Sequence, residues 1–236
     1  MNNNRNSKYF GRDLEAMSIA RNYYKWIINE FKPFLGNRVA EVGAGSGNFS
    51  ELLIKHADHL VAFEPSNNMY QLLKDRFAED HNINTVNNTF RLEYNMFEEY
   101  FDSIVYVNVL EHIEDDYQEL SCVYKSLKSE GFVLLFVPAL SFLYSAFDKD
   151  VGHYRRYRKK KLINLLKNNY FKIIKAKYID FTGILPWYFN FVLFKRPMIQ
   201  KYVIQYDKYV IPVIKKFESL IAPPIGKNLL IVGQKI

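Results

Sequence analysis

One short stretch constrains the fold of this chain more than any other. Residues 39–48 read Val-Ala-Glu-Val-Gly-Ala-Gly-Ser-Gly-Asn, so an apolar run passes into three glycines at alternate positions. Glycine tolerates positive φ and lets a ligand lie directly on the backbone, as happens where a buried strand turns into a helix around a nucleotide. The spacing matches neither the dinucleotide pattern G-x-G-x-x-G nor the phosphate loop G-x-x-x-x-G-K-[ST]. The turn alone is compatible with many nucleotide-binding sheets.

Strand-like and helix-like segments alternate along most of the chain. Strands are predicted for residues 38–42, 60–64, 83–86, 102–107, 131–137, 171–178 and 229–234. Helices are predicted for residues 13–31, 48–55, 69–77, 113–127 and 159–169. This alternation favours a parallel sheet with helices on both faces, the doubly wound α/β class.

Residues 179–228 interrupt the alternation. They begin with an aromatic run, residues 181–194, and continue with apolar residues at helical spacing that Pro212 is expected to kink. We interpret the 236 residues as one domain. Its parts are an N-terminal helical segment (1–36), a cofactor-binding core (37–178), a substrate cap (179–228) and a last strand (229–236).

Charge is distributed unevenly along the chain. Residues 1–150 contain 14 basic and 22 acidic side chains, whereas residues 151–236 contain 18 basic and three acidic ones. The basic C-terminal part indicates either an anionic partner or a solvated basic surface. The single cysteine, Cys122, excludes an intramolecular disulfide, and the N-terminus shows no secretory signal, so a cytoplasmic location is expected.

Two further features complete the pattern begun by the glycine turn. Glu64 ends the second predicted strand, where a carboxylate can accept hydrogen bonds from the hydroxyls of a ribose. Residues 101–112 read Phe-Asp-Ser-Ile-Val-Tyr-Val-Asn-Val-Leu-Glu-His around the fourth strand. Together with the E-x-G-x-G-x-G turn they resemble the class I methyltransferases that depend on S-adenosylmethionine, over about residues 14–180 and the last strand.

The resemblance implies a seven-stranded sheet in the order 3-2-1-4-5-7-6, with only strand 7 antiparallel and the cap inserted between strands 6 and 7. It also implies S-adenosylmethionine as the cofactor, with Glu64 at its ribose. Asn88 stands where many family members carry an acid for the adenine. The implied cofactor-binding residues are Glu41, Gly43, Ala44, Gly45, Gly47, Asn48, Glu64, Pro65, Ser66, Met69, Asn88, Thr89 and Asn108.

Methyl transfer to a hydroxyl needs alignment and a base, and two histidines follow strands whose ends should face the acceptor. His153 lies in Gly-His-Tyr-Arg-Arg-Tyr (152–157), which resembles a subgroup of these enzymes associated with glycan, lipid or natural-product biosynthesis. It is a candidate base, or else part of a structural corner. His112 is a second candidate, or a histidine packed under the cofactor loop. Tyr154, Arg155, Arg156 and Trp187 are candidates for binding the acceptor.

No metal is expected. In quinone O-methyltransferases a similar fourth-strand segment, with Glu in place of Asn108, helps to hold a divalent ion. Asn108 removes that carboxylate here.

These observations predict methyl transfer to oxygen of a small, lipid-linked or glycan-linked acceptor. Asp/Asn-Pro-Pro-Tyr, the motif for methylating nucleic-acid amino groups, is absent after strand 4. The alternatives are an RNA methyltransferase, suggested by the basic C-terminal part, and a non-catalytic cofactor-binding scaffold. The basic residues are interleaved with apolar residues at core-like spacing, which argues against an RNA-binding surface. The intact glycine turn argues against a non-catalytic scaffold.

The aromatic run 181–194 lies between Lys195-Arg196 and the basic stretch 155–161. It predicts either a peripheral contact with an anionic membrane at the inner face, through residues 155–196, or simply a roof over the acceptor pocket. The oligomeric state is not predicted.

Overall fold

The computed structural model describes residues 19–236. The first described helix is α2 (Arg21–Phe31), which confirms the C-terminal part of the helix predicted from residue 13. Residues 19 and 20, also predicted to be helical, lie outside the helix. Residues 13–18 lie outside the described residues, as does the N-terminal segment inspected for a signal.

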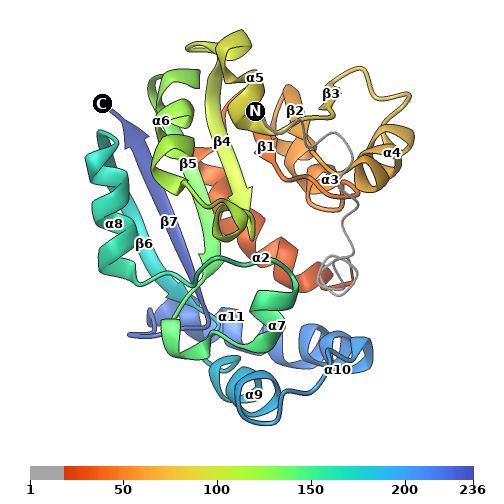
Figure 1. Cartoon of the computed structure of the whole chain (residues 1–236), viewed down its shortest axis with the longest axis vertical. Coiled ribbons are helices and arrows are strands. Elements are labelled where there is room, and N and C mark those ends of the chain that lie inside the picture. Colours follow the sequence, from red (N-terminus) through yellow and green to blue (C-terminus); the bar gives the residue numbers. More distant parts are fainter. Residues whose placement is uncertain (1–18) are drawn as a thin grey trace.

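The centre of the molecule is a seven-stranded sheet (Figure 1). Its order is β3-β2-β1-β4-β5-β7-β6, and β7 runs antiparallel to both of its neighbours, which confirms the predicted topology. The strands are β1 (Arg38–Val42), β2 (His59–Phe63), β3 (Ile83–Val86), β4 (Phe101–Val107), β5 (Leu127–Pro138), β6 (Phe171–Ile179) and β7 (Asn228–Lys235).

The central strands are buried on both faces, which explains their continuous apolar sequences. Ile104 and Val105 are adjacent on β4 and both fully buried, yet they belong to different apolar clusters because successive side chains point to opposite faces. Helices α2, α3, α4 and α11 contribute to one cluster, and α5, α6 and α8 to the other. The α-helices after α2 are α3 (Ser50–Leu53), α4 (Asn67–Arg76), α5 (Phe90–Glu93), α6 (Asp116–Ser126), α7 (Ala146–Asp150), α8 (Lys159–Asn168), α9 (Ile184–Trp187), α10 (Gln200–Gln205) and α11 (Ile211–Leu220).

Most predicted elements differ from the observed ones by a few residues at their ends, and two of these differences are informative. The helix predicted for residues 48–55 is the short α3 followed by a 3₁₀ turn, Ile54–His56. Leu127, expected on the face of the helix before strand 5, instead begins β5 in an extended conformation and pairs with Phe101. An apolar residue at a helix–strand junction fits both periodicities, so spacing alone cannot assign it.

The predicted cap lies between β6 and β7 and contains α9, α10 and α11. In Figure 1 the arrowheads of β4 and β5 point towards the side of the molecule where α7, α9 and α10 lie. Residues 200–220 form consecutive helical segments, in which a π-helical stretch, Tyr206–Val210, joins α10 to α11. Pro212 lies in the first turn of α11, directly after this stretch. No helix among the described residues is long and apolar enough to cross a membrane.

Buried carboxylates attach the cap to the core. Asp207 accepts hydrogen bonds from the backbone N–H groups of Asn22 and Tyr23 at the start of α2. Asp180, at the end of β6, accepts one from the Tyr23 hydroxyl and pairs with Lys227 at 3.0 Å. The cap is therefore fixed against the first helix by charge-assisted bonds as well as by apolar contact.

Another buried carboxyl, that of Glu41 on β1, accepts a hydrogen bond from the Ser50 hydroxyl at the start of α3. Burial raises the pKa of Glu41 to about 8, although this hydrogen bond opposes the shift. Glu41 therefore fixes α3 to the strand that leads into the glycine turn, and its protonated form is favoured in the folded protein.

We expect Glu41→Gln to remove a pH-dependent loss of stability. Because the folded pKa of Glu41, about 8, exceeds its ordinary value of 4.5, folding binds a proton and stability falls as the pH rises between these values. The loss of free energy of unfolding that this pKa shift causes reaches on the order of 2–3 kcal/mol at neutral pH. Urea unfolding at pH 5 and pH 8 should show a larger fall for the wild type than for the variant, in which the amide oxygen still accepts from Ser50. Equal falls would contradict the shift.

Candidate active site

A cavity of about 1160 Å³ lies where the loops after β1, β2, β4 and β5 meet the cap. Its walls come from both parts of the chain: Gly43, Glu64 and Asn108 from the core, and Trp187 and Tyr202 from the cap. Binding sites in open α/β sheets form beyond the carboxyl ends of the strands, so this is the expected position of a ligand.

The glycine turn forms one wall of the cavity. Gly43 has a φ of +73°, and its N–H donates to the carbonyl oxygen of Phe63 on β2. A Cβ atom at this position would lie 2.5 Å from Cγ2 of Val109, so the turn and the loop after β4 can approach only without a side chain here. The structure thereby shows a backbone surface at the cavity, as the sequence pattern indicates.

Glu64 links this turn to the loop after β2. One carboxylate oxygen accepts from the N–H of Gly45 at 2.9 Å, and the other accepts from the N–H of Ser66 at 2.8 Å. Burial raises the pKa of Glu64, while the hydrogen bonds from Ser66 and Gly45 oppose that shift. A carboxylate has about four acceptor sites, so a residue bonded twice can still accept hydrogen bonds from ligand hydroxyls in the cavity.

The predicted cofactor residues divide into two groups. One group lines the cavity: Gly43, Glu64, Pro65, Ser66, Asn88, Thr89 and Asn108. The other does not line it: Glu41, Ala44, Gly45, Gly47, Asn48 and Met69. Members of the second group support the turn, since Glu41 binds Ser50 and Asn48 accepts from Arg76. Direct contact of these residues with a cofactor stays a prediction.

The two asparagines of the first group are held by neighbouring groups. The amide nitrogen of Asn88 donates to the Glu93 carboxylate, and its oxygen accepts from the N–H of Thr89. Asn108 has a φ of +54° directly after β4, and its N–H donates to the carbonyl oxygen of Phe136. Asparagine adopts this conformation more readily than most residues, which suits it to the turn at the cavity wall.

His153 lines the cavity and is oriented by Asp148. Its Nδ1 lies 2.9 Å from Oδ1 of Asp148, an oxygen that also accepts from Nε of Arg156 at 2.8 Å. The other oxygen of Asp148 accepts from the Ser145 hydroxyl and N–H in a capping box at the start of α7. Burial alone would raise the pKa of Asp148, but the bonds from His153 and Arg156 outweigh it and hold the pKa below its usual range.

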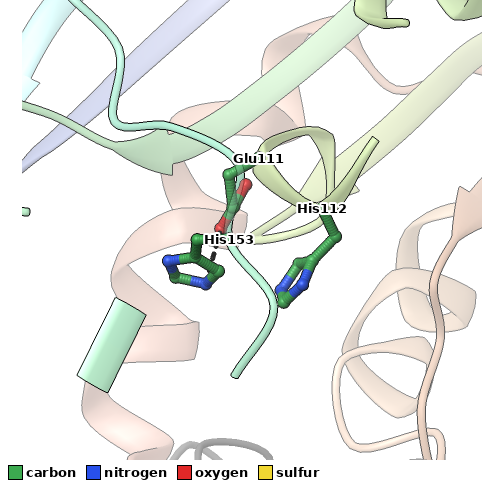
Figure 2. Close-up of side chains that lie close together, drawn as sticks. All are labelled: Glu111, His112 and His153. Carbon is green, nitrogen blue, oxygen red and sulfur yellow. Dashed lines mark ion pairs between the residues drawn. The ribbon is translucent and has the colours of Figure 1, made fainter. Parts of the chain in front are cut away.

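Figure 2 shows two more side chains beside His153, both from the turn after β4. Oε1 of the fully buried Glu111 lies 3.9 Å from Nε2 of His153, and the ring of His112 meets the His153 ring edge-on at 4.5 Å between centroids. Burial and the neighbouring His153 lower the pKa of His112 to about 4, so its imidazole is neutral near pH 7.

Donor atoms of Glu111, His112 and His153 all lie within 4.8 Å of one another. Carboxylate and imidazole groups are ligands that divalent transition metals accept. The expectation of no metal therefore stays a prediction, which rests on Asn108 in the same loop.

The candidates for binding the acceptor are placed differently from one another. Arg156 is buried at the cavity and lies 4.5 Å above the Trp187 ring. Trp187 also lines the cavity, and its Nε1 donates to the carbonyl oxygen of Leu143. Tyr154 lines the cavity as well. Arg155 is not among the lining residues, because its guanidinium pairs with Asp116 at 2.7 Å. The two arginines are thus held by different carboxylates, Arg155 by Asp116 and Arg156 by Asp148.

Sequence reasoning did not single out Asp148, Glu111 or Lys227 as site residues. Lys227 lines the cavity and lies 5.6 Å from the centre of the Trp187 ring. Asp148 precedes His153 by five residues and lies in the short helix α7. This short spacing was the sequence signal that could have indicated their contact. Lys227 comes from the far end of the cap, next to β7, and only the fold brings it to the cavity.

Comparison with known proteins identifies the family. A model described as a methyltransferase domain matches residues 17–176. An uncharacterized methyltransferase of Anoxybacillus flavithermus is 25% identical over 177 residues, which are 75% of this chain and 81% of that protein.

Solved structures share the fold. A SAM-dependent methyltransferase from Archaeoglobus fulgidus superposes with a TM-score of 0.59 and 17% identity, over 91% of this chain and 94% of its own. Phosphoethanolamine N-methyltransferase 2 of Haemonchus contortus, solved with S-adenosyl-L-methionine, has a TM-score of 0.65 and 17% identity, over 91% of this chain and 52% of its own.

The matched model covers the glycine turn, Glu64, the turn with Glu111 and His112, and the loop that carries His153. The chain belongs to the methyltransferase-domain family.

Proposed function

We propose that this methyltransferase uses S-adenosylmethionine to methylate a hydroxyl group on a hydrophobic acceptor, of the lipid-linked or glycan-linked kind, with His153 as the base. The observation that carries the proposal is that the glycine turn with Glu64 and the His153–Asp148 pair line or adjoin one cavity. A donor and an acceptor held in a common cavity can be aligned for direct, in-line transfer.

The core side of the cavity fits the cofactor. Gly43 presents backbone that a side chain would obstruct, and Glu64 presents a buried carboxylate at the end of β2. When bound, S-adenosylmethionine supplies an electrophilic methyl group. Glu64 would hold the ribose hydroxyls, and Asn88 and Thr89, which line the cavity nearby in sequence, would lie towards the adenine.

The acceptor side supplies a base. The hydrogen bond to Asp148 favours the tautomer with its proton on Nδ1 of His153, which leaves the lone pair on Nε2 to take a proton from a hydroxyl. The imidazolium that forms is stabilised by the Asp148 carboxylate, whose lowered pKa keeps it ionised. The His153 side chain is only 10% exposed, so bulk water competes little for that position.

The cap side of the cavity indicates the class of acceptor. Trp187, Phe191 and Tyr202 line it, together with the cationic groups of Arg156 and Lys227. Aromatic walls suit an apolar chain or a sugar ring, and the cations suit an acceptor that also carries a carboxylate or phosphate. A concave cavity with aromatic walls gives less support to a folded RNA, which binds across extended basic surfaces with stacking platforms.

We expect His153→Asn to lower the rate of methyl transfer about 10²- to 10⁴-fold, because the base is lost. The affinity for S-adenosylhomocysteine should change less than about twofold, since His153 lies on the acceptor side. The rate is measured as transfer of labelled methyl groups from S-adenosylmethionine into a lipid extract of the source cells. A product that resists alkali and contains no nitrogen identifies methylation of a hydroxyl to an ether. His56→Asn, at an exposed position outside the cavity, is the matched control.

A variant at His153 that unfolds, or that loses cofactor affinity together with activity, would assign His153 a structural role. Full activity in a folded variant would exclude it as the base.

We expect Glu64→Ala to weaken binding of S-adenosylmethionine by about 1–3 kcal/mol, because ribose hydroxyls lose their buried acceptor. Gly45→Val should also weaken binding, since it disturbs the turn whose N–H holds Glu64. Calorimetry measures both affinities, and Glu79→Ala, at an exposed position outside the cavity, is the control. Unchanged affinity in both folded variants would contradict the proposed cofactor site.

A further inference from the structure

The cap exposes many large apolar side chains. We call these residues and the basic residues among them the cap surface. Its apolar members are Leu185, Phe189, Leu193, Phe194, Ile199, Tyr202, Tyr209, Val213, Phe217, Leu220 and Ile221, and its basic members are Lys195, Arg196, Lys201, Lys208 and Lys216. Exposure is high for several of them: 67% for Phe217, 83% for Leu220 and 78% for Ile221. Large apolar side chains that are exposed in such number on one segment of a chain suggest a surface that binds something.

The exposed apolar residues of α10 and α11 recur at helical spacing. Tyr202, Tyr209, Val213, Phe217 and Leu220 are separated by seven, four, four and three residues, which keeps them along one side of the helix that runs from α10 to α11. Another side of the same helix, with Asp207, Ile211 and Glu218, is buried against the core. The exposed apolar side therefore does not serve the core of this molecule.

On the cap, the acidic side chains are buried and most of the basic side chains are exposed. Residues 179–228, all of which the structure describes, contain seven basic and three acidic residues. The three acids, Asp180, Asp207 and Glu218, are all buried and bonded to groups of the protein. The lysines and arginine of the cap surface are exposed. The outside of the cap is thus apolar and positive.

We propose that the cap surface docks the protein on the surface of an anionic lipid bilayer. Exposed aromatic and aliphatic side chains would enter the boundary between headgroups and acyl chains, and the cations would pair with acidic headgroups, as in interfacial amphipathic helices. A second copy of this chain fits less well, because a symmetric dimer would place the same positive surface on both sides of the interface.

We place the proposed contact mostly later in the chain than the residues that the sequence suggested. Trp187 is hydrogen-bonded to Leu143 and packed on Phe147 and Phe191, and Arg155 is paired with Asp116. These side chains are engaged within the protein. The exposed groups lie mostly later in the chain, in residues 185–221 rather than 155–196.

The cap surface is continuous with the cavity. Arg196, Ile199 and Tyr202 belong to both. A hydrophobic acceptor held in the bilayer would therefore meet the cavity at the docked surface without crossing water. This last step rests on the proposed function, whereas docking itself does not.

The test is partitioning of the full chain, without methyl donor, onto vesicles of phosphatidylcholine with about 30% phosphatidylglycerol, compared with pure phosphatidylcholine. We expect binding to the anionic vesicles that weakens at least tenfold when salt is raised to about 0.5 M. Phe217→Ser with Leu220→Ser should lower the partition coefficient about tenfold or more. Lys208→Glu with Lys216→Glu should do so as well, since each cation near an anionic surface contributes about fivefold. None of these four residues lines the cavity.

Matched controls lie on other elements. Leu72→Ser with Met96→Ser removes exposed apolar side chains of α4 and of the 3₁₀ turn Tyr94–Phe97, and Lys74→Glu reverses an exposed charge on α4. These variants should bind vesicles like the wild type, and all variants should keep the wild-type melting temperature within a few degrees.

Absence of binding to anionic vesicles at low salt would overturn the proposal. So would equal losses in the cap and control variants, or cap variants that convert a dimer to a monomer by light scattering while vesicle binding is unchanged. None of these outcomes would affect the proposed methyl transfer, because no donor is present in the assay.

Discussion

A sheet that is buried on both faces leaves polar side chains few places to meet, and the carboxyl ends of its parallel strands are the main one. Strands β2 and β4 end in the apolar residues Phe63 and Val107, and polar groups then follow at once in Glu64 and Asn108. At this edge the backbone N–H groups of Gly45 and Ser66 bond to the Glu64 side chain rather than to a strand. Both halves of the candidate site, the Glu64 side and the His153 side, depend on this one constraint.

The buried carboxylates around the cavity determine how these groups are oriented. A buried charge without partners would cost about 3–5 kcal/mol, and two of these carboxylates, Glu64 and Asp148, each receive several donors. Glu64 receives two N–H groups, and Asp148 receives His153, Arg156 and Ser145. The same bonds that satisfy Asp148 fix the ring of His153 and the guanidinium of Arg156. Stability and the proposed chemistry therefore draw on the same contacts, and a substitution at Asp148 would affect both.

The sequence predicted most of the fold because local and long-range signals agree in the core. Continuous apolar strands, helical spacing and the glycine turn all indicate one doubly wound sheet, and the observed strand order matches it. Side-chain direction was harder to predict. Nothing in Arg155-Arg156 says which guanidinium reaches the cavity, since that depends on Asp116 and Asp148 in three dimensions. Lys227 could not be predicted at all, because its position depends on how the cap closes between β6 and β7.

The cap, with seven basic and three acidic residues, accounts for part of the uneven charge of this chain. Its three acids are needed inside: Asp207 binds the start of α2, Glu218 binds the N–H groups of Asp180 and Phe181, and Asp180 binds Tyr23 and Lys227. Because these carboxylates are buried and bonded within the protein, they do not neutralise the exposed lysines of the cap. A cap that was merely a roof over the cavity would gain solubility from exposed acids or polar residues in place of Phe217 and Leu220. The exposed apolar side chains lower solubility in water. Together with the exposed cations they become favourable where the surrounding medium is itself anionic and partly apolar, as at the surface of a membrane.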